Sequence, residues 1–269
     1  MTSGLKIAIA GVAGRMGRQL ANAVIDGGQI MAGASEAPGS PHVGKELGEV
    51  LGRPGLSLAV SESVEDAARK ADVWIDFTAP NATLAALAAL RKTNVQAVII
   101  GTTGFDAAGE AEIAEVAGDL AIVKAGNFSL GVNLLCALTR RAAESLGEDW
   151  DIEVLETHHR RKVDAPSGTA LMLGDAAARG RGADLKTLRS PPYDGPDARR
   201  EPGKIGFAVR RSGDVIGEHE VTFGSDMEIL SLSHTALDRA VFANGAIAAA
   251  RWALRQPPGL YDMNDVLGL

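Results

Sequence analysis

The sequence predicts an α/β protein with a Rossmann-like doubly wound parallel sheet and a second, α+β domain with a mainly antiparallel open sheet. Short apolar strands alternate with helices as far as Val123, a pattern typical of parallel sheets covered by helices on both faces. A glycine-rich turn, GVAGRMG, follows the first strand. Beyond Asn127 the pattern changes, and residues 205–234 contain three strands in succession, which favours an antiparallel sheet.

The elements of the first domain follow from apolar runs and turn signals. Strands are predicted over residues 6–10, 29–35, 56–60, 72–77, 95–100 and 120–123. Met16, Leu20 and Val24 recur at helical spacing after the first strand, and Gly27 with Gly28 ends that helix. Further helices are predicted over residues 63–70, 81–92 and 106–117, and a loop is predicted over residues 36–55. The runs VWIDF and VQAVII are apolar throughout, as expected for parallel strands buried on both faces.

The second domain begins with a long amphipathic helix and ends with a strand-rich segment. The helices are predicted over residues 129–146 and 167–179, a strand over 150–156, and an irregular segment over 180–204. The strands FAVRR, DVIGEHEVTF and MEILSLS follow, joined by SGD and GSD turns. A final apolar helix over residues 236–254 is placed to return to the first domain.

Composition and charge exclude several function classes. The chain of 269 residues has a net charge of −7, and acidic proteins are poor nucleic-acid binders. No apolar run is long enough to cross a bilayer or to form a signal segment. The single Cys136 allows no intramolecular disulfide and suits a reducing compartment. We therefore expect a soluble, cytoplasmic protein with no nucleic-acid or membrane partner.

The turn after the first strand has the spacing Gly11-x-x-Gly14-x-x-Gly17, whose first gap is one residue longer than in the usual dinucleotide fingerprint. Because a strand precedes it and a helix follows, it predicts a pyrophosphate site. Glu36 lies about 20 residues on, where a carboxylate accepts from ribose hydroxyls; the alternative is a solvated loop carboxylate. Ala37 follows, with no Arg or Lys nearby for a 2′-phosphate, so the sequence predicts NADH as the preferred cofactor, with NADPH possible.

Two more strand ends are predicted to line the cofactor crevice, because ligands of open α/β sheets lie outside the carboxyl ends of the strands. One is the GTTG segment at residues 101–104, and the other is AGNF at residues 125–128. Ordinary turn chemistry is the alternative for both. A third strand end, residues 76–78, is predicted to approach the nicotinamide side.

The stretch ETHHRRKVDAPSGTA carries five basic or imidazole side chains in a row, which a core could hold only if each charge were paired. The run instead predicts a site for a small dicarboxylate. Asp164 or Ser167 can cap the following helix, whose N–H groups at Gly168 and Thr169 would bind a carboxylate. His158 or Lys162 would deliver a proton at neutral pH. The alternative is a solvated basic face.

His158 and His159 also raise the question of a metal site. Adjacent side chains on a strand point to opposite faces, and no Cys or Glu-x-x-His partner accompanies them. No metal site is therefore predicted. His219 and His234 lie in predicted antiparallel strands and are interpreted as structural histidines.

Together these motifs resemble the dihydrodipicolinate reductase family. The matching segments are IAGVAGRMGRQL, VWIDFT, VIIGTTGF, AGNFSLGVN, ETHHRRKVDAPSGTAL, IGFAVRRSGDVIGEH, FANGA and GLYDMNDVLGL, so the resemblance covers nearly the whole chain. It implies a dinucleotide-binding domain from residues 1–129 and 239–269, with a substrate-binding and oligomerisation domain, residues 130–238, inserted between them. It also implies a homotetramer. The implied reaction is the NAD(P)H-dependent reduction of 4-hydroxy-tetrahydrodipicolinate to tetrahydrodipicolinate, in lysine biosynthesis through diaminopimelate.

The resemblance further implies roles for single residues. His158 would be the proton donor and acceptor, and Lys162 a proton donor. The substrate would be bound by His159, Ser167, Gly168 and Thr169. The cofactor would be bound by Gly11, Val12, Ala13, Gly14, Arg15, Met16, Glu36, Gly101, Thr102, Thr103, Ala125, Gly126, Asn127 and Phe128. Ala37 and Ala79 stand where relatives carry an Arg, which argues against equal use of NADH and NADPH.

Three other functions remain open on sequence grounds. Another amino-acid-pathway dehydrogenase would share the glycine turn but leaves HHRRKVDAPSGT unexplained. A methyltransferase would use a similar sheet and would bind adenosylmethionine. A non-catalytic NAD-sensing regulator would bind the cofactor but would need no proton donor beside a dianion site.

Overall fold

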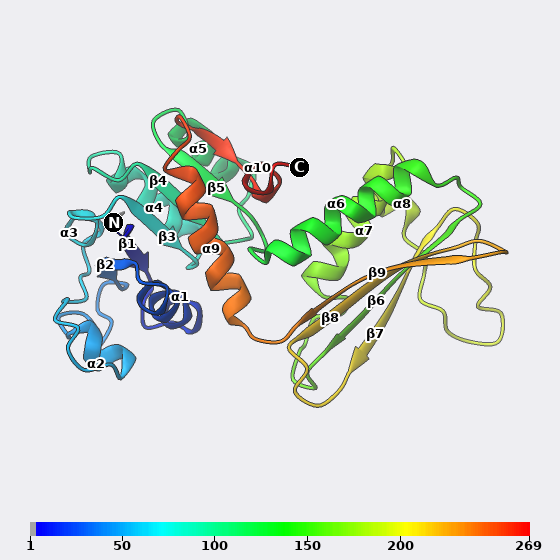
Figure 1. Ribbon diagram of the computed structural model, residues 1–269, viewed down its shortest axis with the longest axis horizontal. Helices are drawn as coiled ribbons and strands as arrows, with labels where there is room; N and C mark the ends of the chain where they lie inside the picture. The colour runs from blue at the N-terminus through cyan, green and yellow to red at the C-terminus, as the bar shows by residue number, and fades with distance from the viewer. Residues whose placement is uncertain (1–3) are drawn as a thin grey trace. The chain divides into compact units, whose positions relative to one another are not determined.

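The computed structural model describes residues 4–269, which form two compact units. The first unit combines the chain up to Ser129 with Ala240–Leu269, and the second unit is Leu130–Arg239 (Figure 1). No helix within residues 4–269 is long and apolar enough to cross a membrane.

A six-stranded sheet with the order β10-β5-β4-β3-β1-β2 forms the centre of the first unit. Its strands are β1 (Lys6–Ala10), β2 (Ile30–Ser35), β3 (Val73–Asp76), β4 (Ala97–Ile100), β5 (Ala121–Lys124) and β10 (Gly259–Tyr261). All neighbouring pairs are parallel, which confirms the predicted doubly wound sheet. The chain moves outward from β1 to β2 and then returns to the other side of β1 with β3. The carboxyl ends of these strands therefore meet at a topological switch point, where such sheets bind ligands.

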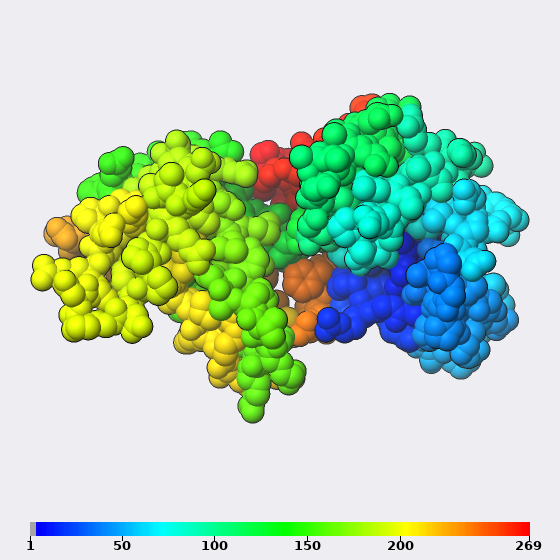
Figure 2. Space-filling view, turned by 180° about the vertical axis from the view of Figure 1, so that it is seen from behind, coloured from blue at the N-terminus to red at the C-terminus, as the bar shows by residue number. Residues whose placement is uncertain are grey.

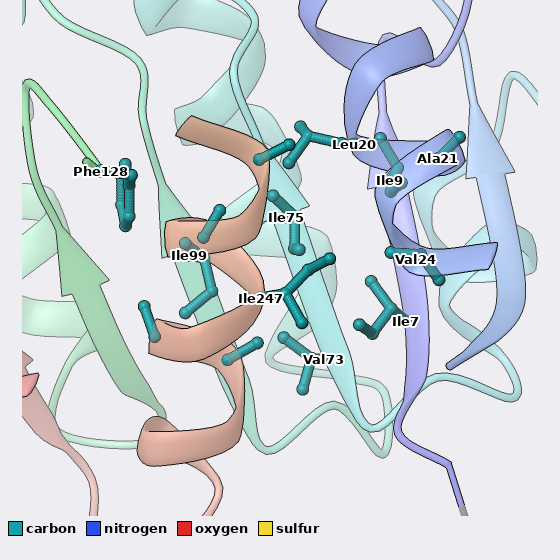
Figure 3. Close-up of a cluster of buried hydrophobic side chains, with 14 of the residues drawn as sticks. Ile7, Ile9, Leu20, Ala21, Val24, Val73, Ile75, Ile99, Phe128 and Ile247 are labelled. Carbon is teal, nitrogen blue, oxygen red and sulfur yellow. The ribbon is translucent and has the colours of Figure 1, made fainter. Parts of the chain in front are cut away.

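Helices cover both faces of this sheet. The α1 helix (Arg15–Asp26) and the α9 helix (Ala240–Ala253) lie on one face, where Ile247 of α9 packs among Val73, Ile75 and Ile99 (Figure 3). These side chains are at most 5% exposed. Full burial of one such aliphatic side chain contributes about 1.5–3 kcal/mol relative to exposure. The α9 helix thereby ties the C-terminal segment to the N-terminal sheet, as the final apolar run suggested.

The opposite face is covered by α3 (Val64–Ala68), α4 (Pro80–Leu90) and α5 (Ala107–Val116). Their apolar side chains pack on Trp74, which is 1% exposed, and on Val98. In Figure 2, seen from behind, the teal to blue-green surface marks the part of the first unit that contains α4 and α5. Strand residues alternate between the two faces, and the central strands β3 and β4 are buried on both sides.

One predicted strand, residues 56–60, is wrong. Only isolated bridges occur there, from Ala59 to Glu46 and from Ser61 to Ser35. The carbonyl groups of this segment instead accept from the first turn of α2 (Leu47–Leu51), a short helix inside the predicted loop. Leu58 O accepts from Leu47 N at 2.7 Å and Leu56 O from Gly48 N at 3.1 Å. The apolar run therefore supports a helix start rather than forming a strand.

The second unit is a four-stranded sheet with the order β7-β6-β8-β9. Its elements are α6 (Leu130–Ser145), β6 (Asp151–His158), α7 (Gly168–Gly180), α8 (Leu185–Leu188), β7 (Ile205–Arg211), β8 (Gly217–Gly224) and β9 (Ile229–Ala236). The α6 and α7 helices cover one face over a core that includes Val154, Val221 and Phe223 (Figure 1).

The pairing of these strands is mainly antiparallel, as predicted, with one exception. β6 pairs parallel to β7 and antiparallel to β8, so it lies between two strands that are consecutive in the sequence. The SGD segment thus connects non-neighbouring strands and is not a hairpin turn. This arrangement places the end of β6, which carries His158, beside the end of β7, which carries Arg211.

Candidate functional site

The glycine turn between β1 and α1 requires glycine at two of its three positions. Gly11 has φ +60°, in the left-handed region that favours glycine. A Cβ at Gly17 would lie 2.1 Å from the carbonyl oxygen of Gly11, so α1 approaches the turn closely. At Gly14 the corresponding distance is 3.1 Å. The sequence motif therefore forms the tight strand–turn–helix that a pyrophosphate site needs.

The backbone N–H groups of this turn differ in their availability. Those of Val12, Ala13 and Gly14 donate to Ser35 O at 3.1 Å, Glu36 Oε1 at 2.8 Å and Gly11 O at 3.0 Å. The α1 helix begins at Arg15 without a side-chain cap on its first turn. Uncapped N–H groups at a helix start attract anions. The N–H groups of Arg15 and Met16 could therefore bind a pyrophosphate, whereas the Val12 N–H already donates to Ser35 O.

Glu36 lies directly after β2 and touches the glycine turn through its bond to Ala13. A carboxylate has about four lone-pair sites. This hydrogen bond orients the carboxylate beside the turn and leaves acceptor capacity for further donors. The geometry is compatible with the predicted ribose contact.

The two predicted loops after β4 and β5 present mostly backbone to their surroundings. Thr102 is 4% exposed, and its hydroxyl lies in a buried network with Asp76. Phe128 is 1% exposed and packs in the core, where a Cβ at Gly245 would lie 1.7 Å from its carbonyl oxygen. A ligand could therefore meet Thr102 and Phe128 only through backbone groups. Thr103 and Gly126 are exposed.

In the second unit a buried carboxylate, Glu156, brings several predicted site residues together. Its side chain is fully buried, and Oε2 is 2.5 Å from Nδ1 of His158. Oε1 accepts from the Ser167 N–H at 3.0 Å. The Arg211 guanidinium binds both oxygens, at 2.8 and 2.9 Å. One carboxylate thus connects the predicted proton donor to the start of the predicted substrate-binding helix.

The electrostatics of this cluster favour an ionised Glu156. Burial, the largest single influence, raises the pKa of Glu156, but the hydrogen bonds from Arg211, His158 and Ser167 together outweigh it. The pKa of the carboxyl therefore lies below its ordinary value. An ionised Glu156 accepts from Nδ1–H of His158, which leaves Nε2 as the ring atom for proton exchange.

Of the two cap candidates at the start of α7, the structure selects Ser167 over Asp164. Ser167 is the N-cap, and its hydroxyl accepts from the Ala170 N–H at 3.2 Å. A Cβ at Gly168 would meet nothing within 4 Å, and the φ of Gly168 is not positive. Neither packing nor backbone strain requires glycine there. The backbone at Gly168 is thus open to an approaching ligand.

Two further histidine observations were not predicted. His219 Nε2 lies 3.2 Å from the Ser167 hydroxyl, and its ring meets that of His158 edge to face with centroids 5.1 Å apart. Its Nδ1 is buried without a partner. Burial, reinforced by the charge of His158, lowers the pKa of His219 to about 4. His219 therefore belongs to the candidate site instead of being only a satisfied structural histidine.

The basic run itself is split between two environments. Lys162 is 20% exposed in its side chain, and its Nζ pairs with Asp164 at 2.8 Å. Arg161 pairs with Asp214 and is exposed. Burial, followed by the charges of Arg161 and Arg239, lowers the pKa of His159. The Lys162 side chain is thus partly buried and paired with Asp164, whereas Arg161 faces solvent.

Glu156 and Arg211 received no role on sequence grounds. Glu156 lies two residues before His158 on one strand, so strand alternation could have placed both on one face. Arg211 is 55 residues away from Glu156, and no local signal links them. Among residues 4–269, no group of three or more His, Cys, Asp or Glu side chains could hold a metal ion.

The fold and the glycine turn define the class of protein, a Rossmann-type dinucleotide-binding enzyme with a second α+β unit. Residues 5–128 match the family described as "Dihydrodipicolinate reductase, N-terminus", and residues 131–267 match "Dihydrodipicolinate reductase, C-terminus". The chain is 51% identical to the 4-hydroxy-tetrahydrodipicolinate reductase of Cereibacter sphaeroides over 98% of both chains. It is 48% identical to that of Roseobacter denitrificans, over 100% of this chain and 99% of the relative. The chain belongs to the dihydrodipicolinate reductase family and is an NAD(P)H-dependent oxidoreductase.

Solved structures share the fold. The dipicolinate-bound dihydrodipicolinate reductase from Paenisporosarcina sp. TG-14 aligns with a TM-score of 0.77 at 23% identity, over 96% of this chain and 97% of that one. An amine dehydrogenase from Mycobacterium smegmatis aligns with a TM-score of 0.64 at 15% identity, over 98% and 96%. At these identities the likeness is evidence for the fold alone.

Proposed function

We propose that this chain reduces 4-hydroxy-tetrahydrodipicolinate to tetrahydrodipicolinate with NAD(P)H, in lysine biosynthesis through diaminopimelate. The observation that carries the proposal is the bridging position of Glu156, which binds His158 and the Ser167 N–H at once. A dicarboxylate substrate needs an anion site and a proton source close together. Relatives about half identical over the full length are named for this reaction, which supports the assignment.

The substrate dianion is held by the start of α7 and by the basic run. The N–H groups of Gly168 and Thr169 donate to one carboxylate, because the open space at Gly168 allows a ligand to contact the backbone. His159 and Ser167 complete this contact. The relative from Paenisporosarcina is described as bound to dipicolinate, a planar dicarboxylate. Such a compound has the charge pattern that this site fits.

When bound, a reduced nicotinamide would supply the hydride. Loss of the substrate's hydroxyl group as water would give the unsaturated ring that accepts this hydride, and the enamine-like product would then need a proton. Lys162 or His158 delivers that proton. Glu156 orients the His158 ring through Nδ1 and thereby keeps Nε2 for the transfer. The attraction between a positioned cation and developing negative charge becomes stronger as the transition state forms. Such an interaction raises the rate.

NADH is the preferred cofactor in this proposal. Glu36 beside the glycine turn suits ribose hydroxyls and repels a 2′-phosphate. Ala37 provides no positive charge next to it. Steady-state assays with both reduced cofactors test this point. A Michaelis constant for NADPH clearly below that for NADH would refute the preference.

The chain also assembles as a cytoplasmic homotetramer in this proposal. The α6 and α7 helices cover only one face of the β6–β9 sheet, and no helix within residues 4–269 covers the other face (Figure 1). The exposed Ile229 and Met227 lie at the β8–β9 end, 72% and 93% exposed. Sedimentation velocity should give the mass of four chains, and a monomer at micromolar concentration would contradict this.

One assay tests the reaction directly. The condensation product of pyruvate and aspartate semialdehyde is generated in situ, and NADH absorbance is followed after the protein is added. We expect absorbance to fall only when protein and condensation product are both present. Constant absorbance, with a chain that binds NADH, would favour a cofactor-sensing regulator. Binding of adenosylmethionine in place of NADH would favour a methyltransferase.

A further inference from the structure

A buried carboxylate that the proposed reaction does not use lies at the end of β3. Asp76 is 1% exposed. Its Oδ1 accepts from the hydroxyl groups of Thr78, Thr83 and Thr102, at 2.6, 3.0 and 3.3 Å, and from the Thr78 N–H at 3.0 Å. These donors are neutral, and a buried carboxylate needs several such bonds to offset its lost hydration. Burying this carboxylate therefore costs folding free energy, which suggests that the network has a function.

The donors come from three separate segments at the switch point of the sheet. Thr78 lies in the loop after β3, Thr83 in α4, and Thr102 in the loop after β4. The Thr102 hydroxyl also accepts from the Thr78 N–H at 3.0 Å, so the two loops are joined directly. A Cβ at Gly11 would lie 2.9 Å from Cγ2 of Thr78, which places the network against the glycine turn as well.

These two loops also border an open pocket. It has a volume of about 330 Å³ and includes Ala79 and Pro80 from the first loop and α4, and Gly104 and Phe105 from the second loop. The position of both loops, and hence the shape of this pocket, depends on the bonds between Thr78, Thr102 and Asp76. The carboxyl ends of β3 and β4 are where a doubly wound sheet receives its ligand.

We propose that Asp76 is a positioning residue for cofactor binding: its carboxylate fixes the loops after β3 and β4 against the glycine turn before the cofactor arrives. Loops that are already ordered lose less conformational entropy on binding. Asp76 acts through Thr78 and Thr102 and does not touch the cofactor itself. This inference rests on the proposed use of NAD(P)H and adds a residue outside the glycine fingerprint.

Two isosteric substitutions separate positioning from stability. Thr102→Val and Thr83→Val each remove one buried hydroxyl that lies within hydrogen-bond distance of Asp76 Oδ1. The two side chains are 4% and 1% exposed, so the loss of stability should be similar. Only Thr102 belongs to a loop at the predicted cofactor site. The Thr83 hydroxyl also donates to the Thr102 hydroxyl at 2.9 Å, but Thr83→Val leaves in place the Thr78–Thr102 bond that joins the two loops. Thr83→Val is therefore the matched control, and Thr102→Ser restores the hydroxyl.

The measurement is NADH affinity by fluorescence titration of the full-length protein, with melting temperatures recorded alongside. Thr102→Val and Asp76→Asn should each raise the NADH dissociation constant about tenfold, the loss expected for about one buried hydrogen bond. Thr83→Val and Thr102→Ser should stay within about twofold of wild type. The Michaelis constant for the dicarboxylate should not change in Thr102→Val.

The inference fails if Thr102→Val and Thr83→Val lower the melting temperature alike while both keep wild-type NADH affinity. In that case the network is structural only, and the proposed reaction stands. If the wild-type protein binds neither NADH nor NADPH, the proposed reaction and this inference both fail.

Discussion

The Nδ1–H of His158 donates a 2.5 Å hydrogen bond to Oε2 of Glu156. The other oxygen of the same carboxylate accepts from the Ser167 N–H at the cap of α7. The buried Glu156 carboxylate therefore orients the ring that we assign to proton transfer. It also holds the helix start that we assign to carboxylate binding. A change at Glu156 should affect the two functions together.

Glu156→Gln should lower kcat by about 10²-fold, because the neutral amide no longer holds the His158 ring in its productive orientation. The Michaelis constant for the dicarboxylate should also rise, since the Ser167 N–H loses its charged acceptor. Glu153→Gln is the matched control, because Glu153 lies on the same strand but pairs with Tyr193 and Arg200. Equal effects of the two substitutions on kcat would contradict the role of Glu156.

Lys162→Ala should lower turnover by about two to four orders of magnitude, the range for the loss of a positioned acid. NADH binding should be nearly unchanged, because Lys162 and the glycine turn belong to different units of the chain. Arg161→Ala removes a neighbouring cation that pairs with Asp214 at the surface, and it should keep most of the activity. Near wild-type turnover of Lys162→Ala would remove Lys162 from the mechanism.

Gly168→Ala should raise the Michaelis constant for the dicarboxylate by about tenfold or more, because the added methyl group occupies the space left for the ligand. The folded protein has room for this methyl group, and Ala favours helices over Gly. The melting temperature should therefore stay the same or increase. A lower melting temperature with unchanged kinetics would show that Gly168 serves the fold.

Stability should depend on pH through His219. Its pKa in the folded protein is lowered to about 4, against an ordinary value near 6.5. Between these two pKa values the unfolded chain binds more protons than the folded chain. The contribution of His219 to the free energy of unfolding is therefore complete above about pH 6.5 and is lost as the pH decreases toward 4. The loss should reach about 3 kcal/mol at most.

Melting temperatures of wild type and His219→Leu between pH 7.5 and pH 4 measure this contribution. The wild-type curve should fall more steeply than that of the variant. Parallel curves for wild type and His219→Leu would contradict the depressed pKa.

Local sequence patterns were sufficient to predict most helices and strands of the first unit. VWID and AVII form β3 and β4, buried on both faces, because continuous apolar runs can satisfy only such positions. The helices predicted to start at residues 63 and 106 do start there, because the side-chain oxygens of Ser63 and Asp106 accept from backbone N–H groups of the first turn. The strand prediction for LSLAV was wrong because carbonyl groups of this run accept from the first turn of α2. The run itself contains no signal for that partner.

In the second unit, contacts between residues far apart in the sequence limited what could be predicted. Nothing in FAVRR indicates that β6 would separate it from β8, because strand order depends on how the helices pack. The ion pair between Glu156 and Arg211 depends on that order. The sequence therefore predicted the α7 cap, but not that the buried Glu156 would connect this cap to His158 and Arg211. It also gave no sign that Asp76 would bind threonines of the loops after β3 and β4.

The most direct test is a crystal structure of the protein with NADH and pyridine-2,6-dicarboxylate. We predict that one carboxylate of the inhibitor accepts from the backbone N–H groups at Gly168 and Thr169, with the His158 ring and the Lys162 ammonium beside the inhibitor. An inhibitor bound away from the start of α7, with these N–H groups in contact with water, would contradict the account.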